Sequence, residues 1–197
     1  EMQRSLVGSE MCIRDSIISN HYASAADGSI IFNAFFKNYF NALVKEEAFK
    51  TKIGNWFLTG VGCIPVKRGE ADIDAYKKVV TVLKNGENIL IFPEGTRNKA
   101  GTDVMAPFKK GVSVFAMRTK VEILPTLYFR MHRPFRKNIL VVGEPIDLLK
   151  EGFDRKQDAE ATEFLYEKMQ ALRVKANEIA KERGLKQYPP RKVKAKK

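Results

Sequence analysis

The amino-acid sequence predicts an α/β fold with a mixed, mostly parallel sheet flanked by helices. Short runs rich in branched residues, such as residues 88–92, alternate along the chain with longer segments whose apolar residues recur at helical spacing. Strands that alternate with helices indicate crossover connections, and hence a largely parallel sheet. With 197 residues, 44% of them hydrophobic, the chain is long enough for one domain with a sizeable core.

Each expected element follows from a local pattern. Apolar runs predict strands at 16–20, 39–44, 62–67, 88–92, 122–129 and 138–143. Longer periodic segments predict helices at 28–37, 46–58, 72–85, 109–118 and 157–183. In the helix at 72–85 the apolar face is supplied by Ala75, Val79, Val80, Val82 and Leu83, and Asn85-Gly86 ends the pattern. Two aromatic groups are expected in the core, with docking on a bilayer as the alternative: Phe32, Phe35, Phe36 and Phe40, and Trp56 with Phe57 and Leu58.

The two ends of the chain differ from its centre. Residues 1–16 have no clear periodicity and resemble a translated sequencing-adapter scar, so we treat them as a non-native segment; a natural, loosely ordered arm is the alternative. The chain begins with Glu rather than Met, and we take it as a fragment. Residues 185–197 are expected to be a basic disordered tail, because residues 191–197 hold five basic residues and no acid.

Composition restricts the class of partner. A formal charge of +12 and a pI near 9.7 indicate an anionic partner, which is either a membrane surface or nucleic acid. The basic excess gathers in the tail, away from the aromatic residues, and this favours a membrane over nucleic acid. No run approaches the roughly 18 apolar residues of a spanning helix. Two cysteines, Cys12 and Cys63, predict no disulfide framework, and two histidines without a Cys cluster predict no metal site.

Polar residues follow two of the expected strands. Asn20 and His21 end the strand at 16–20, and the hexapeptide of residues 92–97, Phe-Pro-Glu-Gly-Thr-Arg, ends the strand at 88–92. Within it Gly95 allows a tight turn and a close approach to a ligand, and Arg97 offers a permanently charged fork for a phosphate. Because open α/β folds bind ligands at the carboxyl edge of the sheet, this pattern predicts a site there. The alternative is an ordinary β-turn followed by a solvated Arg.

With Asp27, these motifs resemble those of the 1-acylglycerol-3-phosphate acyltransferases and other glycerolipid acyltransferases. The Asn-His motif with its following Asp is matched by Asn20, His21 and Asp27, and the Phe-Pro-Glu-Gly-Thr-Arg motif by residues 92–97 in full. Residues 62–69 match an apolar stretch that ends in Arg, and residues 123–125 match an apolar pair before Pro. One departure is that residues 22–26 separate His21 from Asp27, one residue more than the family pattern. Residues 17–184 would then be the acyltransferase domain.

The resemblance implies an O-acyltransferase that moves a fatty acyl chain from acyl-CoA or acyl carrier protein to the free hydroxyl of lysophosphatidic acid. His21 is the expected general base and Asp27 the residue that orients its imidazole. Arg68 and Arg97 would neutralise the acceptor phosphate. The full set of expected substrate-binding residues is Arg68, Glu94, Gly95, Thr96 and Arg97. No cofactor is expected beyond the acyl donor, which serves as co-substrate.

Other readings of the sequence stay open. The acceptor could be glycerol 3-phosphate or another lysolipid, and the added residue before Asp27 could leave an impaired enzyme. A protein of another class would bind anionic lipid or nucleic acid without catalysis, but we expect no nucleic acid partner. We expect a peripheral enzyme of phospholipid biosynthesis on the cytoplasmic face of a membrane, whose partners are the acyl donor, a lysophospholipid acceptor and the membrane surface.

Overall fold

The computed structural model describes residues 3–6, 15–21, 40–67, 72–96, 98, 104–131 and 136–187. Within these residues seven strands form one sheet in the order β1-β7-β6-β2-β5-β3-β4. The strands are β1 (Gln3–Leu6), β2 (Asp15–Ser19), β3 (Phe40–Lys45), β4 (Ile64–Val66), β5 (Asn88–Ile91), β6 (Glu122–Tyr128) and β7 (Ile139–Val142). Every neighbouring pair is parallel except β6 and β7, so the predicted mixed, mostly parallel sheet is confirmed.

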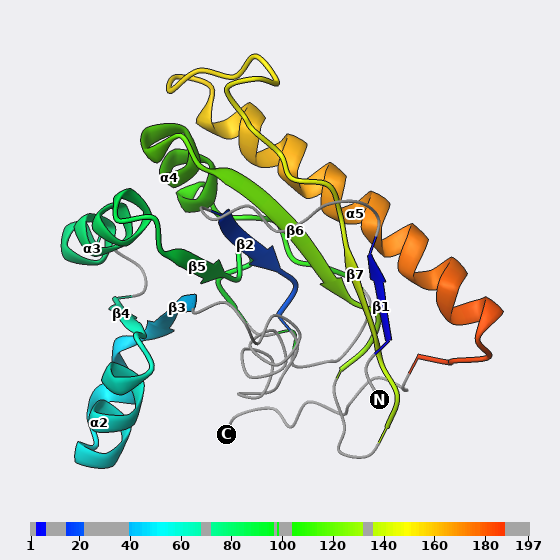
Figure 1. Ribbon diagram of the computed structural model, residues 1–197, viewed down its shortest axis with the longest axis horizontal. Coiled ribbons are helices and arrows are strands. Elements are labelled where there is room, and N and C mark those ends of the chain that lie inside the picture. Colours follow the sequence, from blue (N-terminus) through cyan, green and yellow to red (C-terminus); the bar gives the residue numbers. More distant parts are fainter. Residues whose placement is uncertain are drawn as a thin grey trace, which may run out of the picture.

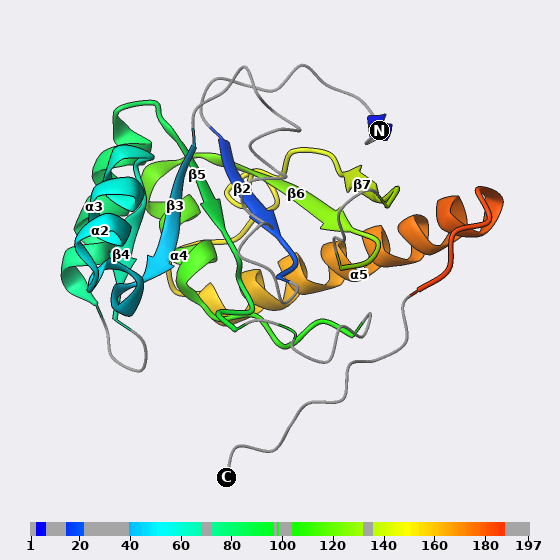
Figure 2. The same cartoon turned by 90° about the horizontal axis from the view of Figure 1, so that it is seen from below.

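The helices are arranged unequally around the sheet (Figures 1 and 2). They are the 3₁₀ helix η1 (Glu46–Phe49), α2 (Lys52–Gly60), α3 (Ile73–Lys84), α4 (Gly111–Thr119) and α5 (Asp158–Glu182). The long helix α5 packs along β6 and β7, while α3 packs against β4 and β5 and against α4. By contrast α2 buries none of its residues and projects beyond the edge of the sheet at β4 (Figure 1).

Alternate residues of the strands face two separate cores, as the two-residue repeat of a strand requires. In β5, Ile89 and Ile91 join the core that α3, α4 and α5 complete, whereas Leu90 faces the opposite core. In β6, Leu127 and Leu124 divide in the same way. The sheet is therefore buried on both faces, as parallel sheets usually are, and its polar functional groups gather at the strand ends.

Most expected helices and strands are present, but one predicted helix is divided into two. The helix predicted at 72–85 is α3, and the Asp72 side chain caps it by accepting a hydrogen bond from the Ala75 amide at 3.0 Å. The single helix predicted at 46–58 is instead divided into η1 and α2. The division falls at Thr51, whose backbone is extended and whose side chain accepts a hydrogen bond from the Gly54 amide at 3.1 Å. A capping Thr therefore begins a second helix that apolar periodicity alone did not separate from the first.

Parts of the chain ends also differ from expectation. Residues 3–6, inside the segment that we set aside as non-native, form the edge strand β1 and pair in parallel with β7. An edge strand needs only the free backbone groups of its neighbour, so hydrophobic periodicity is a weak guide to it. The expected helix at 28–37 and residues 188–197 of the expected tail lie outside the described residues. No described helix is both long and apolar enough to cross a bilayer.

Candidate functional site

The end of β2 is held by the side chain of Asn20. Its Nδ2 donates a hydrogen bond to the Tyr128 carbonyl at 3.2 Å, and its Oδ1 accepts one from the Tyr128 amide at 2.7 Å. Asn20 is 2% exposed, so this amide continues the pairing of β2 with β6 by one residue after the backbone ladder ends. The residue before His21 is thereby fixed to the sheet, a role that the sequence motif did not reveal.

His21 is fixed through its backbone and through its ring. The amide of His21 donates to Glu94 Oε1 at 2.8 Å, and its carbonyl accepts from the Asn98 amide at 2.8 Å. The imidazole stacks on the ring of Phe92, with centroids 4.3 Å apart and an angle of 21° between the planes. Phe92 and Glu94 of the Phe-Pro-Glu-Gly-Thr-Arg motif therefore fix His21 of the Asn-His motif. These contacts connect the carboxyl ends of β2 and β5.

Glu94, an expected substrate-binding residue, accepts hydrogen bonds from two backbone amides. Its Oε1 accepts from the amide of His21, its Oε2 accepts from the amide of Ala106 at 2.9 Å, and its side chain is almost fully buried. Burial raises the pKa of Glu94, while its hydrogen bonds with the two amides oppose the shift. The carboxylate links the end of β2 to the segment that leads into α4, so it acts on the site by positioning His21.

The turn after β5 depends on Gly95. The Gly95 amide donates to the Phe92 carbonyl at 3.0 Å, and the φ angle of Gly95 is +64°, in the left-handed region that favours glycine. The side chain of Lys109 crosses over this residue, and a Cβ atom at position 95 would lie 2.9 Å from Lys109 Cδ and Cε. Glycine therefore permits both the turn and the close approach of Lys109, whose amide also donates to the Pro93 carbonyl at 2.9 Å.

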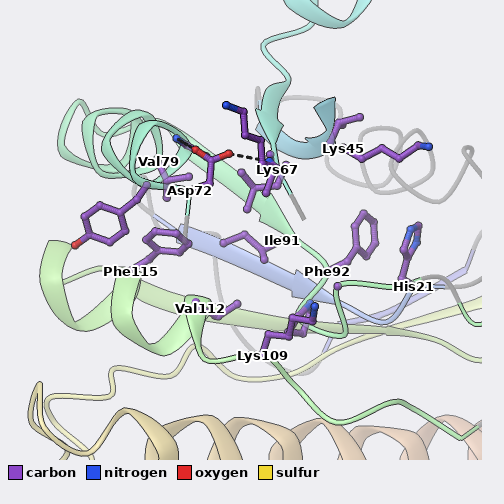
Figure 3. Close-up of a pocket in the computed structure, with 18 of the residues that line it drawn as sticks. His21, Lys45, Lys67, Asp72, Val79, Ile91, Phe92, Lys109, Val112 and Phe115 are labelled. Atoms are coloured by element: carbon purple, nitrogen blue, oxygen red, sulfur yellow. Dashed lines mark hydrogen bonds between the residues drawn. The ribbon is translucent and has the colours of Figure 1, made fainter. Parts of the chain in front are cut away.

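A cavity of about 480 Å³ opens beside this turn. Its lining includes the basic side chains of His21, Lys45, Lys67 and Lys109, the acidic side chain of Asp72, and a larger number of apolar side chains. Figure 3 shows His21 and Phe92 at one end and Val79 and Phe115 at the other, with Ile91 between them. The ring of Phe115 stacks on Tyr76, with centroids 5.3 Å apart. The cavity thus has a basic end beside the histidine and an apolar end between α3 and α4.

The structure brings some of the expected site residues together. His21 and Gly95 line the cavity, Glu94 is buried behind them, and Thr96 is exposed. Asp27, Arg68 and Arg97 lie outside the described residues.

Lys45 and Lys67 line the cavity but were not among the site residues expected from the sequence, although Lys67 lies within the matched stretch of residues 62–69. The signal that could have found them is that each ends or directly follows a strand of the same parallel pair, β3 and β4. The amide of Lys67 is anchored on Asp72 Oδ2 at 2.7 Å.

Comparison with known proteins gives several matches. A family model described as Acyltransferase matches residues 16–128, which is more than half of the 197 residues. A 1-acyl-sn-glycerol-3-phosphate acyltransferase from Borreliella burgdorferi is 35% identical over 126 residues, covering 63% of this chain and 49% of the relative. Another from Cocos nucifera is 31% identical over 140 residues, covering 70% of this chain and 45% of the relative.

The fold also matches a solved structure, that of the 1-acyl-sn-glycerophosphate acyltransferase PlsC from Thermotoga maritima. The TM-score is 0.61 at 24% sequence identity, and the match covers 84% of this chain and 66% of that chain. The chain spans about half the length, or less, of the curated relatives named above. The structural match supports the fold.

Proposed function

Because the chain belongs to the acyltransferase family, we propose that it transfers a fatty acyl chain to the free hydroxyl of lysophosphatidic acid and so makes phosphatidic acid. The relatives from Borreliella burgdorferi and Cocos nucifera are named 1-acyl-sn-glycerol-3-phosphate acyltransferases. The observation that carries the proposal is the cavity, which has His21 at one end, Lys45, Lys67 and Lys109 along its lining with Asp72 beside Lys67, and mostly apolar side chains elsewhere. A substrate with an anionic head and a hydrocarbon chain fits this distribution.

The proposed reaction is a direct transfer from a thioester, carried by coenzyme A or acyl carrier protein. The His21 imidazole accepts the proton of the acceptor hydroxyl, because neutral imidazole is an effective base near neutral pH. The hydroxyl oxygen attacks the thioester carbonyl, the carbon–sulfur bond breaks, and the proton passes to the departing thiolate. Asp27 is proposed to orient the imidazole, as the resemblance implies. The hydrogen bonds from Asn98 to His21 and from His21 to Glu94 support the base assignment, because they fix the backbone that carries it.

Binding of the two ends of the substrate follows from the cavity lining. Lys45, Lys67 and Lys109 supply positive charge for the phosphate at the basic end, and we propose Arg68 and Arg97 as further phosphate ligands. The apolar end suits the acyl chain, because each methylene removed from water contributes about 0.8 kcal/mol. The volume also lies within the range of roughly 300–1,000 Å³ that is usual for small-molecule pockets.

A transfer assay with a panel of acceptors tests the proposal. The purified chain would be incubated with radiolabelled palmitoyl-CoA or palmitoyl carrier protein and with lysophosphatidic acid, glycerol 3-phosphate or a neutral lysolipid. We expect phosphatidic acid as the main product and no product from His21→Ala. His132→Ala is the matched control, since it removes the other histidine of the chain. Equal turnover by His21→Ala and wild type would refute the catalytic role of His21, and preference for another acceptor would refute the substrate assignment.

The place of action is proposed to be the cytoplasmic face of a membrane, with the protein bound peripherally. The acceptor is a lipid, and the chain carries a formal charge of +12, which favours an anionic leaflet. Cell fractionation followed by a salt wash tests this location, because a peripheral protein is released while a spanning one is retained.

A further inference from the structure

Helix α2 presents an apolar stripe to solvent. Ile53, Trp56 and Phe57 are 81%, 77% and 58% exposed, although large apolar side chains usually fill the interior. The three residues have the i, i+3, i+4 spacing of one helix face, so they form a single stripe. Trp56 and Phe57 were predicted to be core residues, and that prediction was wrong. Periodicity identifies which residues share a face and does not show what the face contacts.

The stripe points away from the body of the protein. Gly54 and Leu58, four residues apart on another face of the helix, are the less exposed positions of α2, and Gly54 lies against Ala48 and Thr51. No residue of α2 is buried. A helix without buried residues gains little stability from packing, and nine residues alone are too few for a stable isolated helix in water. A contact outside the described chain would supply the missing burial.

We propose that α2 docks in the interface of an anionic phospholipid bilayer, with Ile53, Trp56 and Phe57 inserted among the acyl chains. The helix is roughly 14 Å long, about half of the hydrocarbon thickness, so it would lie along the surface. Tryptophan favours the interface, because its ring is apolar and its N–H can stay hydrated. Lys50 and Lys52, both exposed, lie at the start of the helix where they can reach lipid phosphates.

A bilayer fits the stripe better than a second copy of the chain. A stable protein interface needs about 800 Å² from each partner. One aliphatic and two aromatic side chains, already partly covered, offer roughly 500 Å² at most. Charge also favours a bilayer over self-association, because the lysines of 45–52 outnumber Glu46 and Glu47 and would repel their equivalents in a second copy.

Docking through α2 would place the cavity at the membrane surface. The helix lies in the chain between Lys45 and Lys67, which both line the cavity. The segment that carries the stripe begins at the carboxyl end of β3, at the edge of the sheet where His21 lies, and returns to the sheet at β4, so it connects two strands whose ends contribute to the cavity wall. The choice of a lipid partner rests on the proposed function, since a lysolipid acceptor would reach the cavity from the bilayer.

Trp56 provides a direct probe, because it is the single tryptophan of the chain. The full chain would be titrated with vesicles of phosphatidylcholine and phosphatidylglycerol in equal parts, containing neither thioester nor lysolipid. We expect a saturable blue shift of the tryptophan emission and its quenching by brominated acyl chains. In 0.5 M NaCl the binding should weaken but the shift should persist, because apolar insertion is not screened. Phe57→Asp should lower the partition coefficient roughly tenfold or more.

Val174→Asp is the matched control, because Val174 is also 58% exposed but lies on α5, across the molecule from α2 (Figures 1 and 2). It should bind as wild type does. The proposal is overturned if Phe57→Asp binds like wild type, if the protein floats with vesicles without a change in Trp56 emission, or if salt abolishes the shift completely. It is also overturned if the shift appears without vesicles as the protein dimerises. Because these vesicles hold no substrate, failure of the acyl-transfer assay would leave the binding result unchanged.

Discussion

Replacing Glu94 with Gln tests whether Glu94 positions His21 or binds the substrate directly. The carboxylate accepts hydrogen bonds from the amides of His21 at 2.8 Å and Ala106 at 2.9 Å, and only 3% of Glu94 is exposed. The Gln side chain keeps one oxygen that accepts a hydrogen bond, but it turns its NH₂ group toward the second backbone amide. One hydrogen bond is therefore lost, and two buried N–H donors face each other. The lost bond and the unsatisfied amide together should lower the free energy of unfolding by about 2–4 kcal/mol.

Circular dichroism is the suitable assay for this change. A chain of this length should lose roughly 4–16 °C in Tm. Glu122→Gln is the control, because Glu122 makes a surface ion pair with Lys150 at 3.3 Å and its loss should cost about 1 kcal/mol or less. In transfer kinetics, Glu94→Gln should lower kcat more than it raises the KM for the acceptor, since the base is displaced while the phosphate ligands remain. An unchanged Tm with a strongly raised acceptor KM would refute the positioning role and favour direct contact with substrate.

The pH dependence of this variant follows from the raised pKa of Glu94. The folded protein holds the proton more tightly than the unfolded chain, whose Glu has a pKa of about 4.3. The stabilisation that the protonated Glu94 side chain contributes is therefore fully present below the pKa of the unfolded chain. It is lost as the pH rises through the raised pKa of Glu94 in the folded protein. Other groups titrate alike in both proteins, so the difference in unfolding free energy between wild type and Glu94→Gln should narrow as pH rises through this window. A difference that widens with pH would contradict the direction of the shift.

Further predictions concern the turn, the strand end and the cavity. Asn20→Ala should lower the free energy of unfolding by about 2–4 kcal/mol in urea titrations, because two buried backbone groups lose their partners, whereas Asn55→Ala on exposed α2 should change it by less than about 0.5 kcal/mol. Gly95→Ala should cost about 1–3 kcal/mol, from its positive φ and from collision with the lysine above it, whereas Gly60→Ala, with no atom within 4 Å of its Cβ, should be neutral or stabilising. Val112→Phe should fill the apolar end of the cavity and shift the preference of the enzyme toward lysophosphatidic acids with shorter acyl chains, as measured by kcat/KM across acceptor chain lengths; an unchanged preference would mean that the acyl chain of the acceptor lies elsewhere.

The sequence predicted six of the seven described strands and the helices that pack on the sheet, because buried residues recur at the spacing of a strand or a helix. Helix α3 is the clear case, since Ala75, Val79 and Leu83 recur on one face and are all buried. His21 and Gly95 were placed correctly at one edge of the sheet, because the ends of parallel strands must meet there.

Contacts between distant segments could not be predicted in the same way. The partners of Glu94 are backbone amides 73 and 12 residues away, and any residue could supply such an amide. The exposed side of α2 has the same spacing as a buried side, so only the fold distinguishes them. Lys45 and Lys67 both line the cavity because β3 and β4 are neighbours in the sheet, and the order of strands in the sheet cannot be read from the sequence.

The connections at the end of β2 bear on how the protein folds. Asn20 binds the backbone of Tyr128, 108 residues away, and His21 binds Glu94, 73 residues away. Contacts of such high sequence separation require closure of long loops, and they form slowly compared with helices. After dilution from urea, helical circular dichroism should therefore recover before acyl transfer does. Emission from Trp56 should follow neither event closely, because 77% of this residue is already exposed in the folded protein.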